Sequence, residues 1–576
     1  MSNNISSKRY LLICEIGPIV DFVTHSRKTI DLWSASFVFS YLMKQVAKEI
    51  ERFGEIFIPD LNNDPLFTGK GIVYSGSIPD QIYAIVSGDK KESLKNALQN
   101  IINDTLKEIA SKIKLKLKIG YEINIDGINE YFNFFYIIHE IKKEQPDYNE
   151  FIEASNKLKM RSFIRTFEQN TGENQINKWK KCSLCGDRES VYYIPVADKK
   201  DFYDDEYFCI VCIIKRYLKE IIKQIVPNIT EELKYQSTSD IALTPIKEFI
   251  EKSEKSIEQK EYKILIEKCE KEKKGIDASE KSEGRFFYDL FRENFSNWKK
   301  EIKEKYPKEL NLKWLDRPFY SIVYMDGDNM SDNLKENKDE NKFRPYVTDV
   351  SKILSSFTNG VNNIVSKYYG KLIFAGGEDI NFIVHPKYLL DCINELNKCY
   401  KNLFKEKATT EPLKDKFTLS VGVCVAYHKY PLSQTIRIAN DMLHEKAKKY
   451  KYKGKEKNAT AISLIKGHTE TLNFVFSNEN IKDLIELKNA LIKSDISRTT
   501  PYRILELEDL FKTLSDTDSK KRYLCSILSG TRNISKKQPE IEKLADLLLK
   551  LTENSDEGIE TMIDALLYAR FLAGDK

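Results

Sequence analysis

The chain has 576 residues, which is more than one hydrophobic core usually supports, so we expect three or four domains. Hydrophobic residues make up 41% of the sequence and charged residues 31%, and this balance excludes a disordered chain. The net charge of +5 comes from 92 basic and 87 acidic residues and identifies no partner, because a local basic patch could still bind nucleic acid. Without an apolar run of roughly 20 residues or a signal-peptide pattern, we expect a cytoplasmic protein that does not enter a membrane.

The first part of the chain alternates strand and helix patterns. Residues 10–16 are apolar and precede Gly17-Pro18, which predicts a buried strand that ends in a turn. Residues 31–53 carry apolar side chains at helical spacing, residues 82–86 resemble a second strand, and residues 92–117 a long amphipathic helix. This order predicts an α+β or α/β domain.

Two cysteine pairs follow. Cys182-x-x-Cys185 and Cys209-x-x-Cys212 have the spacing of a four-cysteine zinc module. Four thiolates leave no open coordination position, so the predicted Zn²⁺ site is structural rather than catalytic. Residues 251–283 are dense in lysine and glutamate, and we expect them to form solvated helix and loop between two domains.

The clearest unit begins near Phe319. An apolar strand at 320–325 ends at Asp326-Gly327-Asp328, and two apolar runs flank Gly376-Gly377-Glu378-Asp379, which predicts a β-hairpin. Further helices are expected at 346–369, 389–404 and 433–450, and further strands at 417–426 and 459–465. The order is close to β-α-β-β-α-β, a ferredoxin-like or palm arrangement. Residues after about 470 show helical periodicity throughout and predict a C-terminal helical domain.

Three carboxylates in this unit have the positions that a two-metal site requires. Joining a hydroxyl to a nucleoside triphosphate needs an activated attacking oxygen and neutralised phosphates, and paired divalent cations held by carboxylates do both. Asp326, Glu378 and Asp379 are therefore the predicted catalytic residues and Mg²⁺ or Mn²⁺ ligands. Because neighbours in a strand face opposite sides, we expect one of Glu378 and Asp379 to bind metal directly and the other to support it. Gly376 and Gly377 would let a triphosphate approach the turn closely.

Other residues near this motif are candidate nucleotide contacts. Gly327 and Asp328 follow the first carboxylate directly. Phosphates also need positive charge, and several lysines lie between the last helix and the last strand: Lys446, Lys448, Lys449, Lys455 and Lys457. Lys448 and Lys457 are the predicted phosphate contacts, although an isolated lysine is usually just solvated. We expect the lone histidines His25 and His428 to be structural.

These motifs resemble the GGDD/GGDEF palm superfamily and, more narrowly, the large polymerase-like subunit of type III-B CRISPR (Cmr) effector complexes. The first supporting segment, at 15–42, is the most specific, because diguanylate cyclases lack it. The segments that carry the resemblance are EIGPIVDFVTHSRKTIDLWSASFVFSYL (15–42), YMDGDNM (324–330), FAGGEDI (374–380), SVGVCVAYHKYPL (420–432) and HEKAKKYKYKGKEKNATAI (444–462).

The resemblance implies an α+β fold with two ferredoxin-like palm domains, a zinc-bearing helical domain between them and a C-terminal helical domain. The expected boundaries are 1–165 for the first palm, 166–313 for the zinc domain, 314–470 for the catalytic palm and 471–576 for the C-terminal helices. Members of this family make a nucleotide second messenger from ATP when their complex captures target RNA. The implied partners are therefore other effector subunits, guide RNA and target RNA.

The resemblance also assigns roles to residues. Asp326 would bind metal, and Glu378 with Asp379 would replace the family's Asp-Asp pair. Lys448 matches a phosphate-facing lysine in the family's A-K helix. The segment from Gly17 to Ser40 would line an acceptor-nucleotide site. In that segment the candidate contacts are Gly17, Ser34 and Ser36.

Two departures from the family leave the reaction open. Glu378 adds one methylene where the family usually has Asp. No histidine is followed by Asp, so we expect neither the HD nuclease domain nor single-strand DNase activity. Some members without that domain resemble enzymes that join ATP to S-adenosylmethionine, so the product is either cyclic oligoadenylate or such a conjugate. The alternatives are a catalytically silent palm scaffold that binds guide RNA and partner subunits, and a diguanylate cyclase, against which the zinc module counts.

Overall fold

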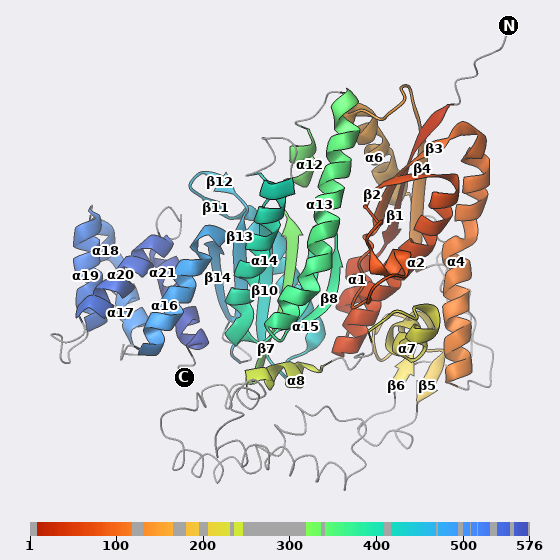
Figure 1. Cartoon of the computed structure of the whole chain (residues 1–576). Coiled ribbons are helices and arrows are strands. Elements are labelled where there is room, and N and C mark those ends of the chain that lie inside the picture. Colours follow the sequence, from red (N-terminus) through yellow and green to blue (C-terminus); the bar gives the residue numbers. More distant parts are fainter. Residues whose placement is uncertain are drawn as a thin grey trace.

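A computed structural model describes residues 8–117, 131–164, 180–194, 206–230, 236–245, 318–335, 340–407, 416–467, 471–493, 499–506, 508–514, 516–529, 538–552 and 558–573. In Figure 1 a first α/β unit lies at the right, a second in the centre and a group of helices at the left. The charged segment 251–283, which we expected to join two domains, lies outside the described residues. Within the described part of the chain, no helix combines the length and the apolar character of a membrane span.

The first palm domain is a four-stranded antiparallel sheet with the order β2-β3-β1-β4. Its elements are β1 (Arg9–Gly17), α1 (Ile19–Thr24), α2 (Thr29–Phe53), β2 (Gly54–Ile58), α3 (Pro65–Thr68), β3 (Gln81–Ser87), α4 (Lys91–Lys116), β4 (Asn133–Ile141) and α6 (Tyr148–Phe163). The β-α-β-β-α-β succession in this strand order is ferredoxin-like. We had predicted β1 and β3 from their apolar runs, whereas β2 and β4 were missed.

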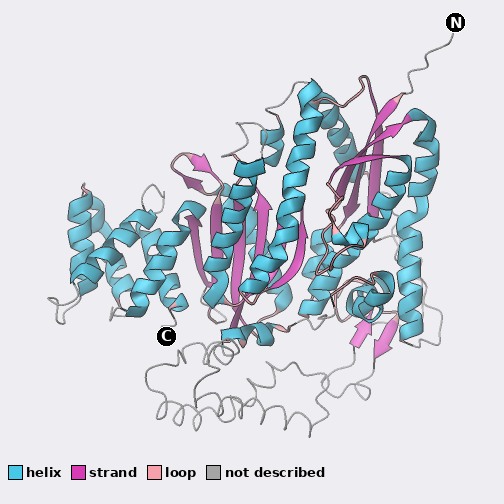
Figure 2. Ribbon diagram, in the orientation of Figure 1, coloured by secondary structure: helices cyan, strands magenta, loops and turns pink. Residues whose placement is uncertain are grey.

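The second palm domain repeats this arrangement and extends it. Its elements are β7 (Phe319–Gly327), α12 (Met330–Leu334), α13 (Glu340–Lys367), β8 (Lys371–Gly376), β9 (Asp379–Val384), α14 (Pro386–Lys407), β10 (Leu419–Tyr427), α15 (Leu432–Asp441), β11 (Lys451–Tyr452), β12 (Lys455–Glu456), β13 (Ala459–Ile465) and β14 (Thr471–Ser477). Strands β10-β7-β9-β8 form the ferredoxin-like core, β13 adds in parallel to β10, and β14 adds antiparallel to β13 (Figure 2). Our expectation of helices throughout the region after 470 was therefore wrong for β14.

The two palm domains pack against each other in a related way. Helix α2 of the first domain contacts β8 of the second, and α13 of the second contacts β2 of the first. Both β2 and β8 are edge strands of their ferredoxin-like units, and both helices follow the first strand of their own unit. The sheet of the first domain is thus covered on both faces, which explains why β1 is apolar at nearly every position.

The cysteine-bearing module and the C-terminal helices complete the described structure. The module contains β5 (Tyr192–Ile194), β6 (Glu206–Phe208), α7 (Ile210–Ile225) and, further along the chain, α8 (Thr238–Ala242). Helix α7 packs on α2 and α4, so the module lies beside the first palm domain (Figure 1). The C-terminal helices are α16 (Ile481–Lys493), α17 (Thr500–Glu506), α18 (Glu508–Thr513), α19 (Thr517–Ser529), α20 (Gln538–Thr552) and α21 (Gly558–Leu572). Helix α21 packs on β14, and the α+β fold with two palm-like domains is confirmed.

Candidate active site at the β8–β9 hairpin

The hairpin and the end of β7 bring the predicted carboxylates to one region. Asp326 is the second-last residue of β7 and pairs in register with Ser420 of β10. Gly377 and Glu378 form the two-residue turn between β8 and β9, and Gly377 has φ +62°, the left-handed conformation that the first position of a type II′ turn requires. A Cβ atom on Gly327 would lie 2.8 Å from Cβ of Glu378. The glycine between the two aspartates therefore allows the Glu378 side chain to lie directly over the end of β7.

Lys448 forms an ion pair with Asp326, as its predicted place near the site requires. It lies in a 3₁₀ turn at Ala447–Lys449 that follows a π-helical turn at Met442–Lys446. This segment approaches β10 closely, since a Cβ atom on Gly422 would lie 2.4 Å from the backbone nitrogen of Leu443. The missing side chain at Gly422 thus permits the close packing that carries Lys448 to the carboxylate.

The hairpin carboxylates hold protons unusually tightly. Burial and the negative charge of Asp326 raise the pKa of Glu378 to about 7, while Lys448 opposes the increase. The loss of solvent around its carboxyl group, the charges of Asp326 and Glu378 and a hydrogen bond with Asp326 raise the pKa of Asp379 well above its ordinary value. The residue as a whole keeps an exposed surface. Ionising all three carboxyl groups together is therefore unfavourable, and a bound cation would relieve their mutual repulsion.

The chemistry of this donor set fits Mg²⁺ or Mn²⁺, because carboxylate oxygens are the ligands that hard divalent cations prefer. The oxygens are not yet gathered as tightly as metal ligands, however. Among the described residues only the four cysteines form a group of three or more whose ligand atoms all lie within 4.8 Å of one another. A metal at Asp326, Glu378 and Asp379 would require a small closure of the hairpin and displacement of the Lys448 ammonium from Asp326.

Asp328, a predicted nucleotide contact, is buried and hydrogen-bonded within the protein. Its side chain is 1% exposed. Its carboxylate accepts hydrogen bonds from the hydroxyl groups of Ser420 (2.7 Å) and Thr418 (2.8 Å) and from the backbone N–H of Asn458 (2.9 Å). Burial raises the pKa of Asp328, and these hydrogen bonds oppose the increase. The carboxylate is thus a structural acceptor.

The candidate residues of the first palm domain have different exposures. Gly17 ends β1 and is partly exposed. Ser34 is fully buried in α2 and, within the described structure, its Oγ has no hydrogen-bond partner. Ser36 is also buried and donates to the Leu32 carbonyl at 3.3 Å. Both serines are buried in this conformation, because α2 is enclosed on nearly all sides over this stretch, and their predicted nucleotide contacts remain predictions.

Sequence reasoning missed an acidic contribution from the first palm domain. The loop before β3 packs on the hairpin: the Ala375 N–H donates to the Gly76 carbonyl at 3.1 Å, and a Cβ atom on Gly376 would lie 2.9 Å from the Ser77 carbonyl oxygen. Asp80 ends this loop, and its charge raises the pKa values of the hairpin carboxylates. Burial and the charge of Glu15 raise the pKa of Asp80 itself to about 6. No local sequence pattern predicts that Asp80 lies near the hairpin, because its position there depends on how the two palm domains pack.

The remaining lysines divide as the solvated-residue argument predicts. Lys446, Lys449 and Lys455 are exposed, and Lys449 pairs with Glu445. Lys457 is only partly exposed and donates to the side-chain oxygen of Asn329 at 2.5 Å. It therefore lies beside the turn that follows Asp326.

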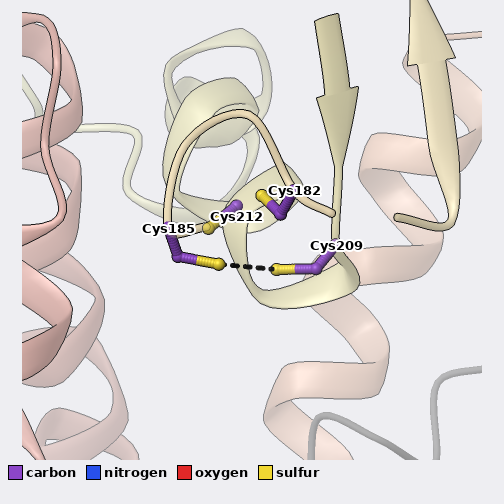
Figure 3. A group of neighbouring side chains, drawn as sticks. All are labelled: Cys182, Cys185, Cys209 and Cys212. Carbon is purple, nitrogen blue, oxygen red and sulfur yellow. Dashed lines mark hydrogen bonds between the residues drawn. The ribbon is translucent and has the colours of Figure 1, made fainter. Parts of the chain in front are cut away.

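The four cysteines form a metal-binding arrangement (Figure 3). Cys209 is the N-cap of α7 and Cys212 lies in its first turn, while Cys182 and Cys185 lie in a turn whose Gly186 has φ +77°. The Sγ atoms of Cys185 and Cys209 are 3.9 Å apart. A tetrahedral Zn²⁺ with Zn–S bonds of about 2.3 Å separates its sulfurs by about 3.8 Å, so the residues fit a structural zinc.

Two basic side chains of α7 connect the cysteine module to the first palm domain through hydrogen bonds. The ammonium of the fully buried Lys215 donates to the carbonyl oxygens of Phe22 and His25. Arg216 binds Asp31 through two hydrogen bonds of 2.7 and 3.1 Å, and Asp31 is fully buried. The turn between α1 and α2 is therefore held by residues that follow the zinc ligands directly.

Two family models match the chain. The second palm domain of Cas10/Cmr2 matches residues 319–461, and the N-terminal region of the CRISPR-associated protein Cmr2 matches residues 11–111. These matches cover the two palm units, including β7, the hairpin, the Lys448 segment and α2. They agree with the strand orders described above.

Known proteins of the same kind are similar over most of the chain. The Cmr subunit Cmr2 of Pyrococcus furiosus is 23% identical over an alignment that covers 84% of this chain and 65% of that protein, so the chain spans less than two thirds of its length. The structure of a type III-B Cmr-beta complex in the apo state contains a chain with a TM-score of 0.68 and 14% identity, covering 99% of this chain and 82% of that one. The Cmr-beta complex bound to cognate target RNA gives a TM-score of 0.64 and 15% identity, with 100% and 84% covered. These structural likenesses establish the fold.

Proposed function

Because the chain belongs to the Cas10/Cmr2 family of type III-B CRISPR subunits, we propose that it is a two-metal nucleotidyltransferase that makes an adenine-nucleotide second messenger from ATP. The product is cyclic oligoadenylate or a conjugate of ATP with S-adenosylmethionine. We propose further that the reaction starts when the effector complex captures target RNA. The partners are then the other subunits, the guide RNA and the target RNA.

The observation that carries this proposal is the grouping of opposite charges at Asp326. The Lys448 ammonium pairs with Asp326, Glu378 lies over the end of the same strand, and Asp379 follows Glu378 in the hairpin. Acidic oxygens for cations beside an ammonium for phosphate are what phosphoryl and nucleotidyl transfer need, since positioning and charge neutralisation supply most of the catalysis. An ordinary structural turn has no reason to hold three carboxyl groups against their mutual repulsion.

The residues of the chain would divide the work as follows. Bound Mg²⁺ or Mn²⁺, held by Asp326, Glu378 and Asp379, would supply Lewis acidity toward the phosphate and the attacking hydroxyl. Lys448 would leave Asp326 and bind a phosphate oxygen as the triphosphate enters. Gly377, where a Cβ atom would meet nothing within 4 Å, leaves the backbone of the turn open to the phosphates, whereas Gly376 is packed against the Ser77 carbonyl. Gly17 lies at the end of the strand where the first domain would receive the acceptor nucleotide.

The test is product analysis from the RNA-activated complex. The complex is incubated with labelled ATP and Mn²⁺, with and without S-adenosylmethionine, and the products are identified by mass. Phosphodiester products from ATP alone would establish oligoadenylate synthesis, and a product that needs S-adenosylmethionine would establish the conjugating reaction. Asp326→Ala should lower either product by at least about 100-fold, since it removes a metal ligand. A parallel reaction with GTP checks the cyclase alternative.

One observation favours a second candidate, a silent palm scaffold. The three carboxylates are not gathered within metal-ligand distances, and Lys448 neutralises Asp326 directly. A scaffold of this kind would bind partner subunits and guide RNA with no metal-dependent nucleotide affinity. Equal ATP affinity with and without Mn²⁺, unchanged in Asp326→Ala, together with no product, would establish the scaffold and refute the enzyme.

A further inference from the structure

A buried polar network joins three separate segments at the end of the second palm sheet. Asp328 follows β7, Thr418 and Ser420 begin β10, and Asn458 ends the β11–β12 hairpin. All three of the latter donate to the Asp328 carboxylate, and the Asp328 N–H donates back to the Thr418 carbonyl at 2.9 Å. A buried carboxylate with this many donors fixes the relative positions of the segments, because losing a donor would leave buried charge uncompensated.

The part of the network that lacks intrinsic stability is the corner at Lys457 and Asn458. Their φ angles are +68° and +49°, and neither residue is glycine. Left-handed conformations of this kind cost free energy and persist when the surroundings impose them. Here the Asn458 N–H is held by Asp328, and the Asn458 carbonyl accepts from the Asn478 N–H at 2.8 Å. The corner is therefore held from β7 on one side and from the end of β14 on the other.

This corner determines where the Lys457 ammonium lies. The Lys457 N–H donates to the Tyr450 carbonyl at 2.8 Å, which closes the β11–β12 hairpin, and its side chain reaches Asn329 in the turn after Asp326. Lys448, on the preceding 3₁₀ turn, reaches Asp326 itself. Two ammonium groups thus flank the strand end that carries the metal-binding candidate, one at each side of Gly327.

We propose that Asp328 is a positioning residue that locks the Lys457–Asn458 corner, and so holds the Lys457 ammonium in place for the triphosphate of the nucleotide substrate. The identity of the ligand as a nucleoside triphosphate rests on the proposed function, whereas the locking of the corner rests on the hydrogen bonds alone. Asp328 touches neither substrate nor metal in this proposal. It acts through Lys457.

The central test is Asp328→Ala in the full-length chain. Alanine removes the acceptor of the Asn458 N–H and of both hydroxyl groups. Asparagine would not serve, because its amide can turn its oxygen toward the Asn458 N–H and donate its NH₂ to the Ser420 hydroxyl. Hydrogen exchange at the 450–458 segment should become at least about tenfold faster, because the Asn458 amide loses its acceptor. The Kd for a non-hydrolysable ATP analogue in Mg²⁺ should rise about tenfold. In a Lys457→Ala background the substitution at Asp328 should cause no further loss of affinity, since its effect passes through that lysine.

Matched variants separate positioning from general damage. Asp104→Ala makes the same charge change at an exposed position of α4 and should alter neither exchange at 450–458 nor the Kd. Ser420→Ala removes only the donor to the other carboxylate oxygen, keeps the Asn458 contact and should give a smaller effect in both measurements. If Asp328→Ala does not fold, graded effects in Ser420→Ala and Thr418→Val decide the question.

Three results would overturn the inference. Unchanged exchange at 450–458 would show that Asp328 does not lock the corner. Faster exchange with an unchanged Kd would show that the corner does not serve the triphosphate, and fully additive losses with Lys457→Ala would show that Asp328 acts elsewhere. Failure of the proposed function is distinguishable, because an analogue that binds the wild-type chain without any product formation refutes the transfer reaction and leaves the positioning result intact.

Discussion

Replacing Gly327 with alanine would place a methyl group against the Glu378 side chain while all three candidate metal ligands keep their identity. The new Cβ would lie 2.8 Å from Cβ and 3.0 Å from Cγ of Glu378, whereas carbon atoms in ordinary contact are about 3.5–4.0 Å apart. The hairpin turn or the strand end must therefore move by about 1 Å. Overpacking of this kind costs about 1–3 kcal/mol of stability. A displacement of about 1 Å in an active site lowers the rate by about 100-fold.

The assay compares the RNA-activated complex containing Gly327→Ala with wild type in Mn²⁺ titrations and in product formation, alongside thermal unfolding of the isolated chain. Gly360→Ala is the control, because a Cβ atom there meets nothing within 4 Å on α13. It should keep wild-type activity and gain slightly in stability. Wild-type Mn²⁺ affinity and rate in Gly327→Ala would refute the placement of Glu378 at the reacting centre.

Two further predictions concern protons and zinc. The raised pKa of Glu378 means that the metal-free folded chain binds this proton more tightly than the unfolded chain, so the stabilisation is full below about pH 4.5 and is lost as the pH rises through about 7. The stability of Glu378→Gln relative to wild type, measured by thermal melting, should therefore increase between pH 5 and 8. The Mn²⁺ affinity of the wild-type chain, measured by calorimetry, should increase between pH 6 and 8. Melting profiles of the two proteins that run parallel over this pH range would contradict the raised pKa of Glu378. Chelation of zinc, or the substitution Cys212→Ser, should lower the melting temperature by several degrees. The 22–31 turn should then be the first site of protease cleavage, because Lys215 and Arg216, which bind this turn, follow the zinc ligands in α7. Cleavage confined to the cysteine module would show that the turn is held independently of the zinc site.

The sequence predicted those elements whose periodicity is strong. The apolar runs of β7, β8 and β9 and the turn glycines located the sheet of the second palm domain and its hairpin correctly. Strand β14 was missed, although Leu472, Phe474 and Phe476 alternate with other residues as a strand requires. The strand was missed because it is short and precedes a long region of helical periodicity.

The sequence predicted the site residues that lie in a recognisable motif, but not those whose position depends on tertiary packing. Lys448 was placed beside the carboxylates by its motif, and the structure pairs it with Asp326. The spacing of Asp326 and Asp328 gave no means of separating a site residue from a buried acceptor, because that difference depends on the hydroxyl donors of β10. Asp80 reaches the hairpin through contact between domains, which no local pattern records.

The ion pair between Asp31 and Arg216 affects the order in which the nascent chain can fold. Asp31 is fully buried, and its cation lies in a helix that leaves the ribosome only after residues 32–215 have been made. A buried carboxylate without its partner is strongly unfavourable, so the start of α2 cannot adopt its final environment on its own. Domains usually fold one by one from the N-terminus during synthesis. The first palm domain, however, can complete its folding only after α7 has been synthesised. A translation product that stops before Arg216 should therefore be a substrate for chaperones and proteases, even though all four strands of its sheet are present.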